Sequence, residues 1–158
     1  MGTTIRPAGP EDLDALASLR PSVHDQHVDA HPEFFKPATP AVARAEAASW
    51  LAQDNAHVLL AEAEGEPVGY VFAHVASRPE SGSVHARRVL LVEQIAVAAA
   101  ARRRGTGAAL LEAVRAVARR LDIQTIDLEV WSFNGNARRF FISQGFTPLR
   151  ERLTQRLG

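Results

Sequence analysis

The segment from Val89 to Leu111 combines an apolar run, three arginines, two glycines and a helix-like run. It reads Val89-Leu-Leu-Val-Glu-Gln-Ile-Ala-Val97, then, after four alanines, Arg102-Arg-Arg-Gly-Thr-Gly-Ala-Ala-Leu-Leu111. Glycines let a backbone approach a ligand closely, and the first turn of a helix leaves amide N–H groups without intrahelical partners. Those amides, the positive end of the helix dipole and the arginines together predict a binding site for a phosphate or pyrophosphate.

The spacing of the glycines excludes two well-known phosphate-binding loops. A dinucleotide-binding fingerprint requires glycine or alanine three residues after Gly107, where this chain has Leu110, and it also requires an opening βαβ unit. A nucleoside-triphosphate loop requires lysine after its last glycine, and Lys36 is the one lysine of the chain. The pattern that remains is Arg102-x-x-Gly105-x-Gly107, between an expected strand and an expected helix.

A second motif follows in the last third of the chain, Asn134-x-x-Ala137-x-x-Phe140-Phe141-x-x-x-Gly145-Phe146. With both motifs at this separation, the chain resembles the GCN5-related N-acetyltransferases, the GNAT family, over nearly its full length. The resemblance implies a single domain over residues 1–158 with a mixed α/β fold. Its sheet would be mostly antiparallel, with a splayed parallel central strand pair and flanking helices. The implied activity is direct transfer of an acetyl group from acetyl-CoA to an amine, without a metal.

The resemblance also assigns residues to the cofactor. The backbone of the central strand would pair with the pantetheine arm, and the amides from Arg103 to Ala108 would hold the pyrophosphate, helped by the arginine side chains. Asn134 matches an asparagine that contacts the cofactor arm in relatives. A solvated surface run is the alternative interpretation of the three arginines. The implied cofactor-binding residues are Ile95, Ala96, Val97, Arg102, Arg103, Arg104, Gly105, Thr106, Gly107, Ala108, Asn134 and Phe141.

Two carboxylates match positions from which relatives deprotonate the acceptor amine. An ammonium has no lone pair, so it must lose a proton before it attacks the thioester. Glu93 matches the position on the central strand that many relatives use, often through water. Glu129 matches the position used by relatives that acetylate protein N-termini. A solvent-facing residue or an ion pair is the alternative for each, and Glu93 is the first choice.

Phe141 stands where the resemblance leads us to expect a tyrosine that protonates the departing CoA thiolate. Phenylalanine has no hydroxyl and cannot donate a proton. Either water or another hydroxyl replaces the tyrosine, or the thiolate leaves unassisted, or the chain is a catalytically weak or inactive CoA-binding regulatory module. A positioned acid contributes roughly 10²- to 10⁴-fold in rate, so its loss alone slows an enzyme without abolishing it. The candidate hydroxyls are Tyr70, Ser132 and Ser143.

The sequence gives fewer indications of which residues bind the acceptor amine. His24, His27 and His31 recur at helical spacing, but Pro32 follows directly and no carboxylate spacing completes a known metal site. We expect them to form a polar rim of the acceptor pocket or a solvated helix face, with Phe34 and Phe35 anchoring the segment against the core. The flanking histidines His74 and His85 are left unassigned. A small-molecule amine or a peptide N-terminus remains open as the acceptor.

Composition narrows the class of protein. Lys+Arg 18 balance Asp+Glu 18 in 158 residues, so no global charge favours nucleic acid or an anionic membrane. The arginine patch is also not interleaved with aromatic residues, which weakens a nucleic-acid interpretation. The absence of cysteine excludes disulfides and a thiol nucleophile, and no apolar run has membrane-spanning length. We therefore expect a cytoplasmic protein, and a homodimer fits what is common among relatives.

The elements that position these residues follow from hydrophobic periodicity and turn signals. A short strand opens the chain, helices come next, and a hairpin precedes the central strand. The helix after Gly107 is expected to bury Leu110, Val114, Val117, Ala118 and Leu121 on one face. The expected ranges are strands over 3–6, 58–61, 68–72, 89–97, 126–131 and 146–153, helices over 10–19, 22–30, from 40 onward, from 107 onward and over 136–144, and a loop over 77–86.

Overall fold

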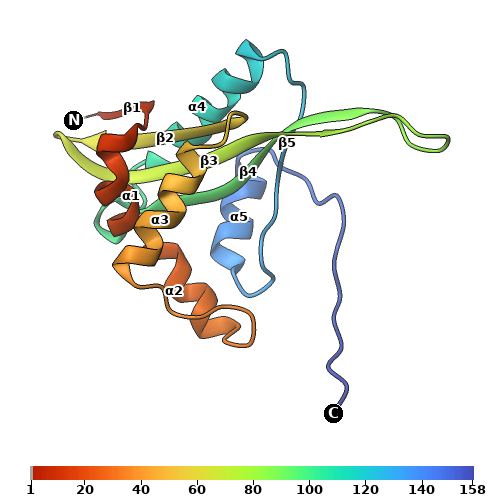
Figure 1. The fold of residues 1–158 in the computed structure, drawn as a ribbon, viewed down its shortest axis with the longest axis horizontal. Helices are drawn as coiled ribbons and strands as arrows, with labels where there is room; N and C mark the ends of the chain where they lie inside the picture. Colours follow the sequence, from red (N-terminus) through yellow and green to blue (C-terminus); the bar gives the residue numbers. More distant parts are fainter. Residues whose placement is uncertain (1) are drawn as a thin grey trace.

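The computed structural model describes residues 2–158, in which five strands form one sheet in the order of the chain (Figure 1). Adjacent strands pair antiparallel up to the fourth, and the fourth and fifth pair parallel. The mixed, mostly antiparallel sheet predicted from the sequence is therefore confirmed. The strands are β1 (Thr3–Pro7), β2 (Ala56–Ala63), β3 (Glu66–Arg78), β4 (Arg87–Val97) and β5 (Ile126–Leu128).

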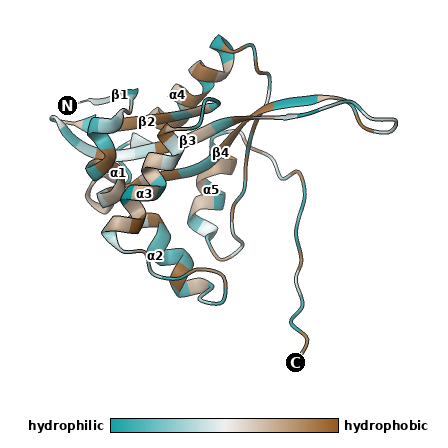
Figure 2. Ribbon diagram, in the orientation of Figure 1, coloured by the Kyte–Doolittle hydropathy of each residue, from teal (hydrophilic) through white to brown (hydrophobic). Residues whose placement is uncertain are grey.

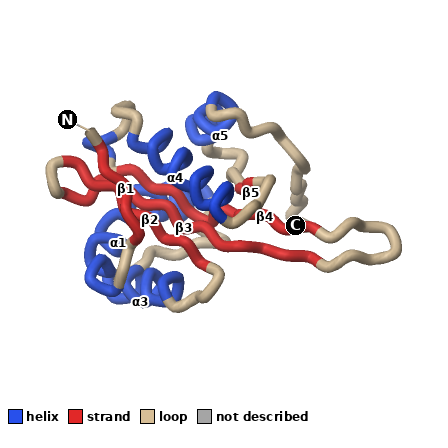
Figure 3. Tube along the Cα trace, turned by 90° about the horizontal axis from the view of Figure 1, so that it is seen from above, coloured by secondary structure: helices blue, strands red, loops and turns tan. Residues whose placement is uncertain are grey.

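Helices cover both faces of the sheet. Figure 3 shows α1 and α3 on one face and α4 and α5 on the other. Pro21 separates the first two helices, as expected for a residue that lacks an N–H group and blocks helix continuation. Thr39 caps α3 by accepting a hydrogen bond from the Val42 amide at 3.2 Å. The helices are η1 (Pro10–Asp12), α1 (Leu13–Leu19), α2 (Pro21–Ala30), α3 (Pro40–Leu51), η2 (Ala99–Ala101), α4 (Thr106–Arg120) and α5 (Gly135–Ser143).

Each face of the sheet carries its own hydrophobic cluster. Leu110 and Val114 of α4 pack against Val71 and Leu90, which confirms the predicted apolar face of that helix. On the opposite face, side chains of α1 and α3 pack against Tyr70 and other residues of β2 and β3. Figure 2 shows the corresponding hydrophobic colouring along the central strands and α4. The sheet is thus buried on both sides, which agrees with the continuous apolar run of β4.

Three of the expected strands differ from the structure in ways that matter for the site and the end of the chain. β3 continues to Arg78, so the connecting loop covers 79–86 and forms the end of a hairpin that projects from the body (Figure 1). β5 ends at Leu128 instead of residue 131, because β4 pairs with it only as far as Val92. The expected strand over 146–153 is wrong, since no regular element follows α5. A strand needs a neighbouring strand for its backbone groups, and this segment pairs with none in the described part of the chain.

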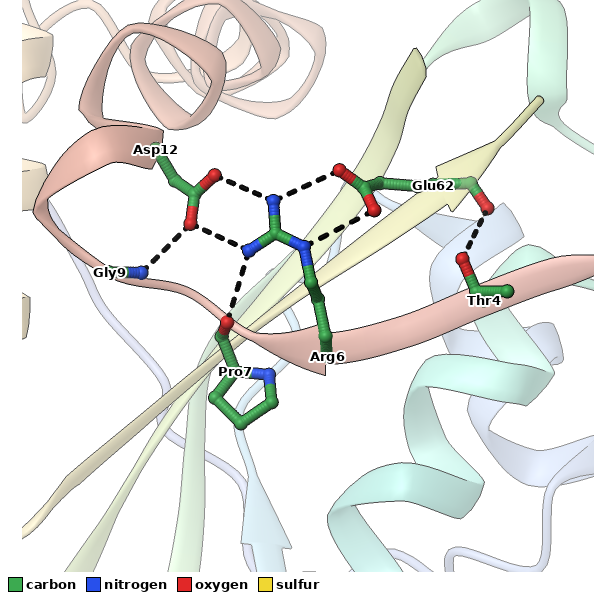
Figure 4. A network of polar contacts seen from close by, with 6 residues as sticks. All are labelled: Thr4, Arg6, Pro7, Gly9, Asp12 and Glu62. Carbon is green, nitrogen blue, oxygen red and sulfur yellow. Dashed lines mark hydrogen bonds and ion pairs between the residues drawn. The ribbon is translucent and has the colours of Figure 1, made fainter. Parts of the chain in front are cut away.

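An ion-pair network joins the first strand to its neighbours (Figure 4). Arg6 donates to both carboxylate oxygens of Asp12, at 2.9 and 2.8 Å, and to both oxygens of Glu62, at 3.2 and 3.0 Å. Asp12 is buried and also accepts from the Gly9 amide at 2.8 Å. The Arg6 hydrogen bonds, helped by that amide, hold the pKa of the Asp12 carboxyl below its usual range.

Asp12→Asn should lower the free energy of unfolding at neutral pH by about 2 kcal/mol, because the buried carboxylate loses its charge and with it the charge-assisted hydrogen bonds from Arg6. The Asp12 pKa is lower in the folded than in the unfolded chain. Its stabilisation is therefore present above the ordinary aspartate pKa and is lost as pH falls through the folded value. Urea unfolding across acidic and neutral pH measures this difference. Asp14→Asn, at an exposed carboxylate, is the control; an equal loss in both variants would contradict the role of burial.

Candidate functional site

The two parallel strands of the sheet separate after a short ladder. Their paired residues run from Leu90 opposite Ile126 to Val92 opposite Leu128. The next residues along the two strands are Glu93 and Glu129, the two predicted bases. β4 continues beside β3 as far as Val97. Among the described residues, no strand covers the outer edge of β4 beyond Val92.

That open edge presents backbone hydrogen-bonding groups. The Ala98 amide donates to the Val68 carbonyl at 2.8 Å, toward β3. Because backbone groups alternate along a strand, the N–H and C=O groups of Ile95 and Val97 point to the opposite, open side. Arg102 Nε donates to the Val97 carbonyl at 3.2 Å, which is consistent with that direction. An extended ligand can therefore pair with β4 as an added strand would.

A β-bulge lies where the strands separate. Phe72 pairs with Gln94 and Ala73 with Val92, so Glu93 is an extra residue in β4. The bulge turns Glu93 and Gln94 to the same face, where each meets a side chain of β3. His74 Nε2 lies 2.7 Å from Glu93 Oε1, and the Tyr70 hydroxyl donates to Gln94 Oε1 at 2.8 Å. The sequence alone predicts no role for His74 or Gln94, because one inserted residue in a strand ladder leaves no local pattern.

The two polar pairs differ in their access to solvent. Glu93 is exposed and His74 is half-buried, so a polar substrate can reach this carboxylate. Tyr70 is fully buried, and burial raises the pKa of its hydroxyl above the usual range. This hydroxyl already has an acceptor in Gln94. Tyr70 is therefore a poor candidate for the acid that Phe141 cannot provide.

The predicted glycine turn forms the start of α4. Gly105 precedes the helix with φ of 82°, a left-handed conformation that favours glycine, and Arg103 shares that region with φ of 62°. Within residues 2–158, no protein acceptor is recorded for the amides from Arg103 to Ala108. These amides lie at the positive end of a 15-residue helix. Arg102 donates to the Ser22 carbonyl at 3.1 Å, whereas the exposed side chains of Arg103 and Arg104 can reach an anion.

The second motif packs against the first. An added Cβ at Gly107 would lie 3.0 Å from Cζ of Phe140, so the glycine allows this ring to contact the helix start. Phe141 is 7% exposed and packs edge-on against Phe146. Asn134 Oδ1 accepts from the Ala137 amide at 3.1 Å and caps α5, which leaves its amide nitrogen for a further partner. Phe140 belongs to the second motif, although the sequence predicts no role for it, and its ring contacts the glycine turn.

The remaining predicted groups are dispersed. Glu129 lies beyond the end of β5, its side chain is 82% exposed, and its oxygen is 3.6 Å from the guanidinium of Arg150. No hydrogen bond of the described chain joins it to Glu93. Ser143 donates to the Phe140 carbonyl of its own helix at 2.6 Å, and Ser132 lies exposed in the loop after β5.

An aromatic cluster joins α2 to the loop before α5. The ring of His27 contacts Phe35 at 5.2 Å and Phe133 at 5.3 Å between centroids, and that of His31 contacts Trp131 at 4.9 Å. His27 Nδ1 donates to the Val23 carbonyl at 2.9 Å. Phe34 is exposed and packs against His31 and Trp131, so its predicted anchoring against the core is wrong. Histidines and aromatic rings therefore pack together between α2 and the loop before α5.

Among residues 2–158, no group of three or more His, Asp or Glu residues is arranged to hold a metal ion. None of the helices from residue 2 onward is long and apolar enough to span a membrane.

A family model of known proteins matches residues 20–146, which include both motifs, the bulge and the separating strands. Its description is the acetyltransferase (GNAT) family. The chain belongs to the GNAT family. No curated protein sequence matches the chain.

Solved structures share this GNAT fold along the whole chain. A tetramutant of the BH1408 protein from Bacillus halodurans has 24% identity and a TM-score of 0.92, covering 98% of this chain and 99% of its own. The aminoglycoside N-acetyltransferase AAC(6')-Iy in complex with CoA has 18% identity and a TM-score of 0.78, covering 99% and 95%. The aminoglycoside 6'-N-acetyltransferase AAC(6')-Ih from Acinetobacter baumannii has 19% identity and a TM-score of 0.76, covering 99% of both chains.

Gly107→Trp tests the glycine turn. A bulky side chain here displaces Phe140 and covers the free amides, so affinity for acetyl-CoA should fall about tenfold or more in isothermal titration calorimetry. Gly82→Trp, in an exposed loop where an added Cβ has no neighbour within 4 Å, is the matched control and should bind like wild type. Unchanged affinity in a folded Gly107→Trp variant would contradict the site.

Proposed function

We propose that this protein is an acetyl-CoA-dependent N-acetyltransferase that acetylates a primary amine of a small molecule or peptide by direct transfer in a ternary complex. The observation that carries the proposal is the position of Glu93 at the bulge, next to an open strand edge that leads into an anion-binding helix start. The edge, the helix start and the carboxylate supply the three functions that such a reaction needs.

Acetyl-CoA would extend along β4. Backbone groups of Ile95 and Val97 offer the donors and acceptors that the two amides of the pantetheine arm require, with Ala96 between them. The pyrophosphate would then meet the free amides from Arg103 to Ala108, a turn that includes Gly105, Thr106 and Gly107. Arg103 and Arg104 can add charge-assisted hydrogen bonds, while Arg102 keeps the end of β4 beside the turn. The CoA named with AAC(6')-Iy supports this choice of cosubstrate.

Glu93 would be the general base. Its carboxylate takes a proton from the acceptor ammonium, directly or through water, and the free amine nitrogen attacks the thioester carbonyl. The carbon–sulfur bond then breaks, the acetyl group stays on nitrogen, and the thiolate takes up a proton. His74 donates toward Glu93 Oε1 and so orients the carboxylate. Glu129 is the weaker candidate, because its side chain is nearly fully exposed outside β5.

Relatives with a tyrosine at the position of Phe141 can protonate the CoA thiolate from its hydroxyl. This protein needs another source for that proton. Tyr70 is buried and Ser143 donates to its own helix, which leaves water, Ser132 or unassisted departure of the thiolate. We infer a slow but working transferase. A CoA-binding regulatory module with little or no catalysis is the second candidate, and Phe141 is the observation that favours it.

The acceptor would approach from the side of α2. At its start, this helix accepts a hydrogen bond from Arg102 through the Ser22 carbonyl. At its end, His31 contacts Trp131 and Phe133 of the aromatic cluster. The names of the aminoglycoside acetyltransferases identify amine-bearing small molecules as their substrates, which supports an amine acceptor here. A panel of amines with detection of CoA thiol distinguishes the two candidates: the enzyme releases CoA faster with one of the amines, and the module does not.

Glu93→Gln should lower kcat for the best amine roughly 10²- to 10⁴-fold at neutral pH and leave affinity for acetyl-CoA unchanged. The amide keeps the size and the contact with His74 but cannot accept the proton. Glu129→Gln is the matched control, with an expected effect below about threefold. A stronger effect at Glu129 than at Glu93 would reverse the assignment of the base.

Phe141→Tyr should raise kcat if the missing hydroxyl limits turnover, by up to roughly 10²-fold. Phe146→Tyr, at the neighbouring ring, controls for a hydroxyl added nearby. An unchanged or lower rate in a folded Phe141→Tyr variant, measured by CoA release, would show that the proton comes from another source.

A further inference from the structure

The side chain of Gln94 has a free hydrogen-bond donor beside the proposed base. Gln94 Oε1 accepts from the Tyr70 hydroxyl at 2.8 Å, whereas Gln94 Nε2 donates to no other group of residues 2–158. Within this range, the buried side-chain atoms without a partner belong to Arg20, so the unpaired nitrogen of Gln94 is accessible. The bulge turns Glu93 and Gln94 to the same face of the sheet. The donor and the carboxylate can therefore meet the same ligand.

Buried residues fix the orientation of the Gln94 amide. Tyr70 is fully buried, and burial raises the pKa of its hydroxyl above the usual range, so the hydroxyl keeps its proton and needs an acceptor. The guanidinium of Arg20 packs on the ring of Trp50, as Tyr70 does, but it has only donors. Gln94 Oε1 is thus the acceptor for Tyr70. A flipped amide would leave a buried hydroxyl without an acceptor, so Nε2 is held on the side away from Tyr70.

A neutral donor next to a carboxylate is selective for the ligand that it binds. The N–H groups of an amide pair with oxygen acceptors such as a hydroxyl or a carbonyl. A carboxylate on the ligand would be repelled by the charge of Glu93, and His74 is already within 2.7 Å of that side chain. When an acceptor amine meets Glu93, an oxygen on the next carbon but one from its nitrogen lies toward the neighbouring side chain, Gln94. The donor therefore fits a neutral oxygen close to the amine.

We propose that Gln94 determines acceptor specificity by binding a neutral oxygen, a hydroxyl or an amide carbonyl, on the carbon next to the amine-bearing carbon. Tyr70 is the positioning residue that holds the amide of Gln94 in the required orientation. The inference rests on the proposed function, because it takes Glu93 as the group that meets the amine. The favoured acceptors are 1,2-amino alcohols and α-amino amides. Amines without such an oxygen and free α-amino acids bind less tightly.

The binding of three related amines tests this selection. L-phenylalaninamide has the neutral oxygen, phenethylamine lacks it, and L-phenylalanine has a carboxylate in its place. Isothermal titration calorimetry on protein saturated with CoA gives their dissociation constants without turnover. Wild type should bind phenylalaninamide roughly three- to tenfold more tightly than phenethylamine, which corresponds to one neutral hydrogen bond, and should bind phenylalanine no better than phenethylamine. A wild type without this preference would overturn the proposal.

Tyr70→Phe combined with Gln94→Leu removes both members of the pair, so no buried hydroxyl is left without an acceptor. The double variant should bind phenylalaninamide and phenethylamine with equal affinity. Tyr70→Phe alone keeps the amide but not its orientation, and it should lose part of the preference. Gln53→Leu, at an exposed glutamine beyond the end of α3, is the matched control and should keep the preference of wild type.

The ratio of the two dissociation constants separates recognition from a structural role. A general disturbance of the site weakens both amines equally, and that result, or a preference that survives the double substitution, would overturn the proposal. The ratio does not depend on activity. Failure of the proposed transferase would appear separately, as no release of CoA from acetyl-CoA with any amine or as no binding of CoA, and in the latter case the same titrations are made on the free protein.

Discussion

The short β4–β5 ladder is the constraint on which the rest of the site depends. The ladder begins at Leu90 and stops at Val92, and Arg87 holds both oxygens of Asp127 at 2.7 and 3.1 Å just beside it. Because the strands are joined at one end only, they can diverge at the other. Divergence frees the edge of β4, ends β5 early and leaves the bulged Glu93 at the point of separation. A longer ladder would close this edge and leave no place for an extended ligand.

The second face of the sheet carries the glycine turn at the start of α4, where we propose that the pyrophosphate binds. α5 packs along α4 at two points: Phe140 contacts Gly107 at the helix start, and Arg115 donates to the Gln144 carbonyl at 2.8 Å further along. The glycine turn therefore has a fixed place relative to the motif that follows β5. The two sequence motifs form one packed unit, although nearly thirty residues separate them in the chain.

The sequence predicted those parts of the protein that local patterns determine. Four features depend on residue spacing over a short stretch of sequence, and the structure agrees with each. They are the amphipathic face of α4, the separation of α1 and α2 at Pro21, the β2–β3 hairpin and the glycine turn. The pairing of Glu93 with His74 depends on one extra residue in a ladder between β3 and β4. The length of β5 depends on where another strand turns away. Such long-range features have no local pattern, and the same reason explains the wrong strand over 146–153.

A crystal structure with acetyl-CoA bound tests the central claim most directly. The account predicts hydrogen bonds from the pantetheine arm to backbone groups of Ile95 and Val97, the pyrophosphate on the amides from Arg103 to Ala108, and the acetyl group beside Glu93. A cofactor bound elsewhere, or an edge of β4 that stays free of it, would contradict the account.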